Sequence, residues 1–276
     1  MEEARVASIP LISVISPTCE ERHIFHPLLY ECFRSQAHPR KELVVVDTGG
    51  KPSAFLEECA RSDPRVIYRF FHEPLATKEL RELEPARGRR AQMAAQPSKR
   101  CWTAERPKGG QCHKPEPWSL GLKRNIACHL ARGIVIAHFD DDDLYSPDYL
   151  GYMCSQLLAG EQNSARAAVD AGGAEQEEAA GGWLRPAAAT LSEWHLLDLK
   201  DLTFGLLDVR RDALIQRQDW HGWLYGWGFS YVYSRAAWEF APFPNVDFSE
   251  DIGWMDTLRD AGVPVTLVQL PASGHE

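Results

Sequence analysis

The amino-acid sequence predicts an α/β domain with a mostly parallel central sheet. Residues 11–15 and 42–46 are short apolar, β-branched runs that indicate buried strands, and between them apolar side chains recur on one face of a helix over residues 24–33. The first run ends at Pro17 and the second at Asp47-Thr48-Gly49-Gly50. A strand, a helix and a second strand in this order form the unit from which parallel sheets are built.

Two further units continue this alternation. Residues 52–61 are expected to be helical and 66–70 extended. Next comes a helix with Leu122 and Leu130 on one face, which stops at Gly133 before a strand over 134–139. Because ligands bind at the carboxyl ends of parallel strands, we expect the polar residues at these strand ends to converge on one crevice.

The remainder of the chain is expected to complete one domain over 1–276. Extended runs are predicted over 189–194, 203–209, 229–233 and 265–268, with a helix over 250–261 that is capped by Ser249 and closed by Gly262. Two stretches without sustained periodicity, 72–118 and 159–189, are expected to be long mobile insertions in the loops.

Composition and charge exclude several classes of protein. The chain has 30 basic and 39 acidic side chains, a net charge of −9, which opposes binding to nucleic acid. The basic stretch 78–114 is better explained as a solvated loop than as a docking patch.

The seven cysteines lack the spacing of a disulfide framework, and Cys112-His113, eleven residues after Cys101, is a weak metal signal. No window resembles a membrane span or a signal peptide, so we expect a soluble chain, cytoplasmic by default.

Four successive carboxylates follow the strand that ends at Phe139. Asp140, Asp141, Asp142 and Asp143 would repel one another at a strand end unless a cation or several donors neutralise them. Ser146 and Pro147 are then expected to cap and begin the next helix. This setting favours a hard divalent metal, which would also bind a diphosphate, over a merely solvated acidic turn.

Taken in order, these motifs resemble those of GT-A-fold glycosyltransferases of the large inverting family 2, which includes bacterial polysaccharide and cell-surface enzymes. The resemblance covers nearly the whole chain outside the two insertions. It rests on the strand 11–18 with its Pro-Thr ending, Val44-Val45-Val46-Asp47, Gly121-Leu122-Lys123-Arg124-Asn125, Ala131-Arg132-Gly133, the Asp-x-Asp-Asp stretch and Ser249-Glu250-Asp251. It implies a Rossmann-like domain with a nucleotide-binding half over 11–143 and an acceptor-binding half over 144–276.

The resemblance also implies roles for individual residues. Asp142 would be the main metal ligand, with Asp140 beside it, and Mn²⁺ or Mg²⁺ the metal. Asp251, with Glu250 next to it, would be the general base for the acceptor hydroxyl. The nucleotide-sugar donor, with a UDP-sugar as the first choice, would lie against Pro17, Thr18, Glu20, Asp47, Arg124, Asp140 and Asp141, and Asp141 and Asp140 could exchange roles.

The sequence departs from the family pattern in two places. Cys19-Glu20 replaces the aromatic-Asn pair that is common after Pro-Thr. The chain also lacks the Gln-x-x-Arg-Trp sequence of processive synthases, so transfer of a single sugar is favoured over polymerisation.

The acceptor side and two alternative functions remain open at this point. Trp227 and Gly228 could contact a carbohydrate, lipid or protein acceptor, although large aromatic residues are equally typical of a core. His275 could reach the metal, but a terminal histidine is more often exposed. A nucleotidyltransferase would share the metal and the crevice, and a non-catalytic relative of a transferase would bind sugar or metal without turnover.

Overall fold

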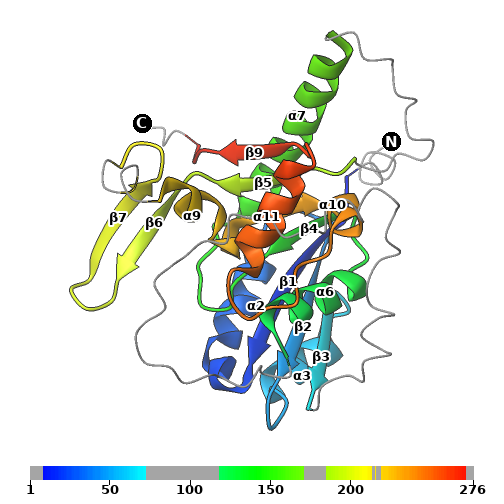
Figure 1. The fold of residues 1–276 in the computed structure, drawn as a ribbon. Coiled ribbons are helices and arrows are strands. Elements are labelled where there is room, and N and C mark those ends of the chain that lie inside the picture. Colours follow the sequence, from blue (N-terminus) through cyan, green and yellow to red (C-terminus); the bar gives the residue numbers. More distant parts are fainter. Residues whose placement is uncertain (1–8, 73–117, 171–184, 213–214, 216–218, 272–276) are drawn as a thin grey trace.

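A computed structural model describes residues 9–72, 118–170, 185–212, 215 and 219–271. These residues form a seven-stranded sheet with helices packed around it and a separate two-stranded hairpin (Figure 1). The strand order in the main sheet is β3-β2-β1-β4-β8-β5-β9. The predicted insertion 72–118 lies outside the described residues except at its two ends.

Four parallel strands form the N-terminal half of the sheet: β1 (Ile12–Cys19), β2 (Lys41–Thr48), β3 (Val66–Phe71) and β4 (Val135–His138). Their register aligns the strand ends that carry polar residues. Thr18 of β1 lies opposite Asp47 of β2, and Ile15 lies opposite His138, just before the four aspartates. The predicted convergence of these strand ends is therefore present in the fold.

Two of the helices between these strands, α3 (Ala54–Ser62) and α6 (Leu120–Leu130), begin at a serine that caps them. The 3-10 helix η1 (Glu20–Phe25) leads into α2 (His26–Ser35), which has a proline in its first turn. Ser53 accepts a hydrogen bond from the Leu56 amide at the start of α3, and Ser119 does the same for Leu122 in α6. The three predicted β-α-β units are therefore confirmed.

The C-terminal half of the sheet contains one reversed strand. β8 (Val232–Ser234) is antiparallel to both β4 and β5 (Ala188–Leu191), while β9 (Val265–Val268) is parallel to β5. The sheet is thus mostly parallel, as predicted. β6 (Glu193–Asp198) and β7 (Thr203–Asp208) form the separate antiparallel hairpin.

Five helical segments accompany these strands: α7 (Tyr149–Asp170), α9 (Trp220–Tyr225), η2 (Gly228–Ser230), α10 (Arg235–Phe240) and α11 (Glu250–Asp260). None of the helices in the described part of the chain is long and apolar enough to cross a bilayer.

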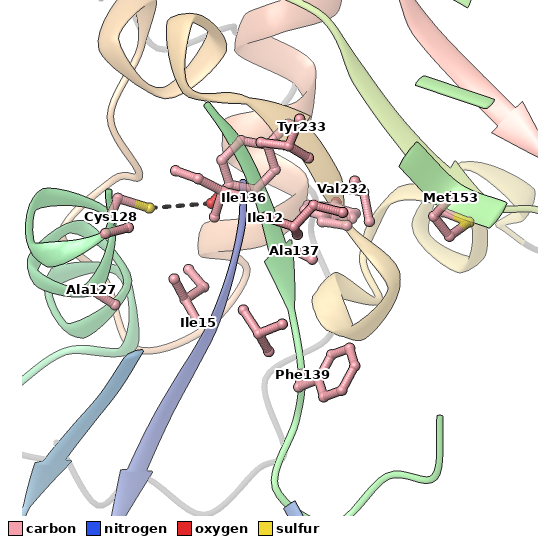
Figure 2. Packing of buried hydrophobic residues seen from close by; sticks show 14 of the residues in the cluster. Ile12, Ile15, Ala127, Cys128, Ile136, Ala137, Phe139, Met153, Val232 and Tyr233 are labelled. Carbon is pink, nitrogen blue, oxygen red and sulfur yellow. Dashed lines mark hydrogen bonds between the residues drawn. The ribbon is translucent and has the colours of Figure 1, made fainter. Parts of the chain in front are cut away.

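The core lies between the sheet and the helices that pack on it. Ile136 and Ala137 of β4 lie at its centre beside Ile12 and Val232, all with no exposed surface (Figure 2). On the α6 side, the Cys128 sulfur lies 3.2 Å from the Tyr233 hydroxyl. The continuous apolar runs of the strands are explained by this burial on both faces.

Four predictions of local structure were wrong in whole or in part. The predicted extended run 229–233 begins in the 3-10 helix η2, and only its end belongs to β8. Residues 159–170 continue α7 and 188–189 belong to β5, so the insertion 159–189 is not a loop at either end, while 171–184 lie outside the described residues. Helix α7 begins at Tyr149, so Ser146 is not its cap. Ser249 has a left-handed backbone, φ 63°, and its side chain makes no capping hydrogen bond.

Candidate functional site

The aspartate turn, residues 140–143, follows β4 and is attached to the end of β1 through Asp141. The side chain of Asp141 is 1% exposed and accepts hydrogen bonds from the Thr18 hydroxyl (2.6 Å) and from Arg22 Nε (2.6 Å). Arg22 Nη2 also contacts Asp141 and lies 2.6 Å from Asp142 Oδ1. Both oxygens of Asp141 are therefore engaged inside the protein.

The other carboxylates of the turn are held less tightly. Asp142 has a side chain that is 43% exposed, whereas Asp140 and Asp143 are partly buried. Burial raises the pKa of Asp140, and burial together with the charges of Asp140 and Asp142 raises the pKa of Asp143 to about 7. The turn thus carries more negative charge than its surroundings neutralise.

Tyr145 fixes the direction of this turn. Its ring is stacked on Phe139 at 3.7 Å between centroids, and its hydroxyl accepts a hydrogen bond from the Asp140 amide (2.9 Å) and donates one to the Phe229 carbonyl (3.0 Å). The turn is therefore tied to the segment that precedes β8.

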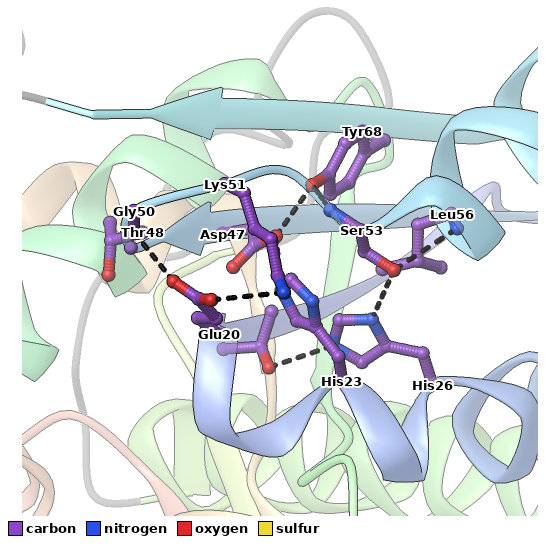
Figure 3. Close-up of polar contacts among 12 residues, drawn as sticks. Glu20, His23, His26, Asp47, Thr48, Gly50, Lys51, Ser53, Leu56 and Tyr68 are labelled. Atoms are coloured by element: carbon purple, nitrogen blue, oxygen red, sulfur yellow. Dashed lines mark hydrogen bonds and ion pairs between the residues drawn. The ribbon is translucent and has the colours of Figure 1, made fainter.

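Asp47, at the end of β2, is fully buried with one oxygen paired and one left over. Its Oδ2 accepts hydrogen bonds from the Tyr68 hydroxyl (2.6 Å) and from His23 Nε2 (3.0 Å). Its Oδ1 is buried and has no hydrogen-bond partner among the described residues, and no dashed line reaches it in Figure 3. A buried carboxylate oxygen in this state is a place where a ligand donor would be favourable.

A directed chain of hydrogen bonds links the N-cap of α3 to the end of β1 and to the aspartate turn. Because Thr18 donates to Asp141, its hydroxyl oxygen accepts from His26 Nε2 (3.0 Å), and His26 Nδ1 accepts from the Ser53 hydroxyl (2.8 Å; Figure 3). Burial, aided by His23, lowers the pKa of His26 to about 4, so the ring is neutral as this chain requires.

Glu20 and Lys123 hold the loops at this edge of the sheet, beside Pro17. Glu20 accepts a hydrogen bond from the Gly50 amide (2.8 Å) and pairs with Lys51 (3.5 Å). Lys123 Nζ donates to the Thr18 carbonyl (3.1 Å) and to the Thr48 hydroxyl (3.2 Å). Pro17 lies in β1 opposite Val46.

Arg124 and Glu250 form a buried ion pair next to the aspartate turn. Their side chains are 4% and 3% exposed, and Arg124 Nη2 lies 3.2 Å from Glu250 Oε1. Burial lowers the pKa of Arg124, but Glu250, Asp140 and Asp251 together outweigh this effect and raise it. The guanidinium therefore pairs with Glu250 at the start of α11 and interacts electrostatically, without a hydrogen bond, with Asp140 of the aspartate turn.

Asp251 is oriented by backbone donors in the first turn of α11. Its Oδ2 accepts from the Gly228 amide (3.0 Å) and its Oδ1 from the Ile252 amide (2.7 Å), and the residue is 9% exposed. A Cβ atom at Gly228 would lie 2.5 Å from Arg124 Nη1, so a larger residue there would displace the guanidinium.

Trp227 is the exposed aromatic residue next to this glycine. It is 42% exposed and stacks on Trp223 with 5.3 Å between ring centroids. Trp194, at the base of the hairpin, lies 6.0 Å from it. An exposed aromatic face of this kind can stack on an apolar sugar face.

The described residues hold no preformed cluster of three or more His, Cys, Asp or Glu side chains around a metal position. The donor set is nevertheless of the right chemistry, because Mg²⁺-type cations are commonly held by one or two carboxylates together with substrate phosphates. A cationic group, Arg22, already lies on two of the aspartates. Asp140 and Asp142 thus fit a metal that phosphate oxygens help to bind.

The structure brings most of the predicted residues to one edge of the sheet and adds some that sequence reasoning missed. Thr18, Asp47 and the aspartate turn meet there, whereas Glu250 is engaged by Arg124 and His275 lies outside the described residues. The missed residues are Arg22, His23, His26 and Tyr68. Only Arg22 had a local signal in the sequence: it is a basic residue shortly after Pro17-Thr18, and its positive charge could neutralise the aspartates.

No protein-family model matches the chain, and no curated protein matches it significantly. Solved structures that are similar include a mycobacterial protein (15% identity, TM-score 0.50, 97% of this chain and 67% of that one). A second is the mannosyltransferase PcManGT from Pyrobaculum calidifontis in complex with GDP-Man and Mn²⁺, with 16% identity, a TM-score of 0.49 and coverage of 98% of this chain and 60% of that one. A third is the glucosyl-3-phosphoglycerate synthase from Mycobacterium tuberculosis in complex with Mn²⁺, UDP and phosphoglyceric acid, with 14% identity, a TM-score of 0.48 and coverage of 96% and 70%. This chain spans 60% of PcManGT and 36% of TarS from S. aureus. At these identities the likeness concerns the fold alone, where it agrees with the predicted α/β class.

Proposed function

We propose that this chain is a metal-dependent, inverting and non-processive glycosyltransferase of the GT-A type. It would move a sugar from a nucleotide diphosphate sugar, a UDP-sugar in the first instance, to the hydroxyl of a carbohydrate, lipid or protein acceptor. Two of the similar structures were solved with UDP or GDP-Man and with Mn²⁺, and the proposal places ligands of this kind at the edge of this sheet.

One observation carries the proposal: Arg124 interacts with carboxylates on two sides of the same edge. Asp140 belongs to the aspartate turn after β4, whereas Glu250 and Asp251 begin α11. A sugar transferase needs a carboxylate group for the departing diphosphate and another for the attacking hydroxyl. Here one guanidinium, which pairs with Glu250, also interacts electrostatically with Asp140 on one side and Asp251 on the other.

The nucleotide would be held by the ends of β1 and β2. Asp47 Oδ1 would accept a hydrogen bond from the base, satisfying its buried lone pairs. Pro17, Thr18, Glu20 and Arg124 would line the remainder of the donor site, with Asp140 and Asp141 at the ribose and diphosphate.

Asp142 and Asp140 would hold the metal, Mn²⁺ or Mg²⁺, which when bound offsets the charge that develops on the departing nucleoside diphosphate. Asp251 would accept the proton of the acceptor hydroxyl, because its oxygens keep a lone pair each after accepting one backbone amide. Glu250 would hold Arg124 beside it. Trp227 and Gly228 would contact the acceptor.

The test is a screen of UDP-, GDP- and dTDP-sugars with Mn²⁺ and candidate acceptors, in which nucleoside diphosphate release is followed. Asp142→Asn and Asp251→Asn should each abolish most turnover, while Asp148→Asn, an exposed control just after the turn, should not. Turnover that is unchanged in the first two variants would refute the assigned roles.

Other products would point to other functions. Release of pyrophosphate would identify a nucleotidyltransferase, since that reaction attacks the α-phosphorus. Binding of nucleotide sugar without release of nucleoside diphosphate would identify a non-catalytic module.

A further inference from the structure

Arg22 occupies a central position at the aspartate turn without a role in the chemistry described so far. It lies in η1, immediately after β1, and its guanidinium lies over the Phe25 ring at 5.5 Å from the centroid. Its Nε and Nη2 contact Asp141, and Nη2 also reaches Asp142. Hydrogen bonding with Asp141, partly opposed by burial, raises the pKa of Arg22, so the group is a permanent cation.

The two aspartates that share this cation differ in how firmly they are held. Asp141 is buried and has a second partner, Thr18, at 2.6 Å. Asp142 is 43% exposed and lies at the rim, 2.6 Å from Arg22 Nη2. Releasing Asp142 therefore exposes no buried charge, whereas releasing Asp141 would leave a desolvated carboxylate unpaired. The guanidinium can give up Asp142 and stay bound to Asp141.

We propose that Arg22 is a resident counter-cation that competes with a divalent metal for Asp142, so that it sets the affinity of the turn for that metal. This inference rests on the proposed metal-dependent function. Both cations interact with Asp142 Oδ1, and this oxygen cannot keep its full interaction with the guanidinium while it ligates a metal. They also repel one another across a short distance.

Competition of this kind links metal binding to the donor substrate. In the free protein Arg22 neutralises part of the turn, which lowers the gain from binding a metal. A diphosphate brings negative charge that both the metal and the guanidinium can share, so the two cations no longer compete. Arg22 thereby favours binding of the metal together with the nucleotide over binding of the metal alone.

The decisive measurement is the Mn²⁺ affinity of the full chain without nucleotide, followed by the electron paramagnetic resonance signal of free Mn²⁺. Arg22→Gln removes both the competitor and its repulsion, so we expect binding to tighten by about two- to five-fold, the range of a partly exposed ion pair. Arg22→Lys keeps the charge but loses the paired contacts, so its affinity should lie between those of Arg22→Gln and the wild type. The gap between Arg22→Gln and the wild type should shrink as salt is added.

Arg34→Gln is the matched control. Arg34 is an exposed arginine on α2 that pairs with Glu31, and its replacement changes the net charge by the same amount away from the turn. It should leave Mn²⁺ affinity unchanged. Circular dichroism reports whether each variant is folded. If Arg22→Gln is unfolded, the Mn²⁺ affinity of Arg22→Lys, compared with that of the wild type, tests the proposal instead.

Several outcomes would overturn the proposal: unchanged or weaker Mn²⁺ binding in Arg22→Gln, an equal gain in Arg34→Gln, or no binding by any variant. A further arm with UDP should show that nucleotide improves Mn²⁺ binding more in the wild type than in Arg22→Gln. Since the first arm uses Mn²⁺ alone, a failure to find sugar transfer would leave its result intact and would count against the proposed function only.

Discussion

The buried pair of Arg124 and Glu250 yields a prediction in which the two single substitutions are unequal. Breaking a buried ion pair from one side costs about 3–5 kcal/mol, because a desolvated charge is left behind. Both side chains are below 5% exposed, so solvent screening does not reduce this figure. In Glu250→Gln the remaining guanidinium still interacts electrostatically with Asp140 and Asp251, and burial raises the pKa of Glu250 to about 7, so its ionised form is itself destabilised. The loss should therefore lie at or below the low end of this range, at about 1–3 kcal/mol.

Arg124→Met should cost more. It leaves Glu250, Asp140 and Asp251 without their shared cation, and burial already raises the pKa of Glu250 despite the pairing with Arg124. We expect about 4–5 kcal/mol, and a double variant Arg124→Met/Glu250→Leu should recover part of this loss.

Urea denaturation, followed by fluorescence at pH 7.5 without divalent cations, measures these changes. Each kcal/mol should also lower Tm by about 2–4 °C for a chain of this size. The reasoning fails if both single variants lose less than about 1 kcal/mol, if Glu250→Gln is the more damaging, or if the double variant shows the sum of the two losses.

Three shorter predictions concern other parts of the fold. Gly160→Ala should destabilise the fold by about 1–3 kcal/mol, since the new Cβ would lie 1.9 Å from the Thr266 hydroxyl. Gly151→Ala, in the same helix, meets nothing within 4 Å and should stabilise the fold by about 0.5–1 kcal/mol. Thermal melts of the two variants measure the difference. The fold raises the pKa of Asp143 from its ordinary 3.8 to about 7, so the ionised form of this side chain opposes folding. Asp143→Asn should therefore raise the free energy of unfolding by about 1–3 kcal/mol at pH 8 but not at pH 4. An effect that does not depend on pH would contradict this reasoning. Asp251→Asn should lower kcat by about 10²–10⁴, while the loss of one backbone hydrogen bond should lower stability by only about 0.5–1.5 kcal/mol; full turnover, or a variant that thermal melts show to be unfolded, would contradict the assigned role.

The strands were predictable because their signal is local. The runs that form β1 and β2 are apolar and β-branched, so neither identification needs distant contacts, although β1 continues through Pro17 to Cys19 and β2 through Asp47 to Thr48. The predicted end of α11 is likewise supported by Gly262, which adopts φ 74°.

The length of α7 was not predictable from the same kind of signal. Its second half belongs to the stretch 159–189, which as a whole is rich in Ala, Gly and Glu, a composition that is also typical of linkers. Gly160 weakens helix propensity, yet it allows α7 to approach β9 closely, as the Thr266 contact shows. That advantage depends on a strand more than a hundred residues away, so tertiary packing decided what propensity left open.

The site was predictable as a set of strand ends but not as a network. The positions of Asp47 and the aspartate turn follow from where strands stop. The partners that organise them do not: Arg22 meets Asp141 across 119 residues, and Tyr68 reaches Asp47 from the neighbouring strand. For the same reason, the sequence left the Asp-x-Asp register open, since the contacts of Thr18 and Arg22 with Asp141 arise only in the fold.

The reversed strand β8 has a consequence for the order in which the chain can fold. It lies between β4 and β5, although it follows both in the sequence, and β9 pairs on the far side of β5. On the ribosome, the second edge of β4 therefore stays unpaired until residues 232–234 have emerged, and β5 has no place in the sheet before then. Pairings over such separations are slow to form. The half that carries Thr18 and Asp47 can assemble early, while the half that carries Asp251 must wait for nearly the whole chain to be synthesised.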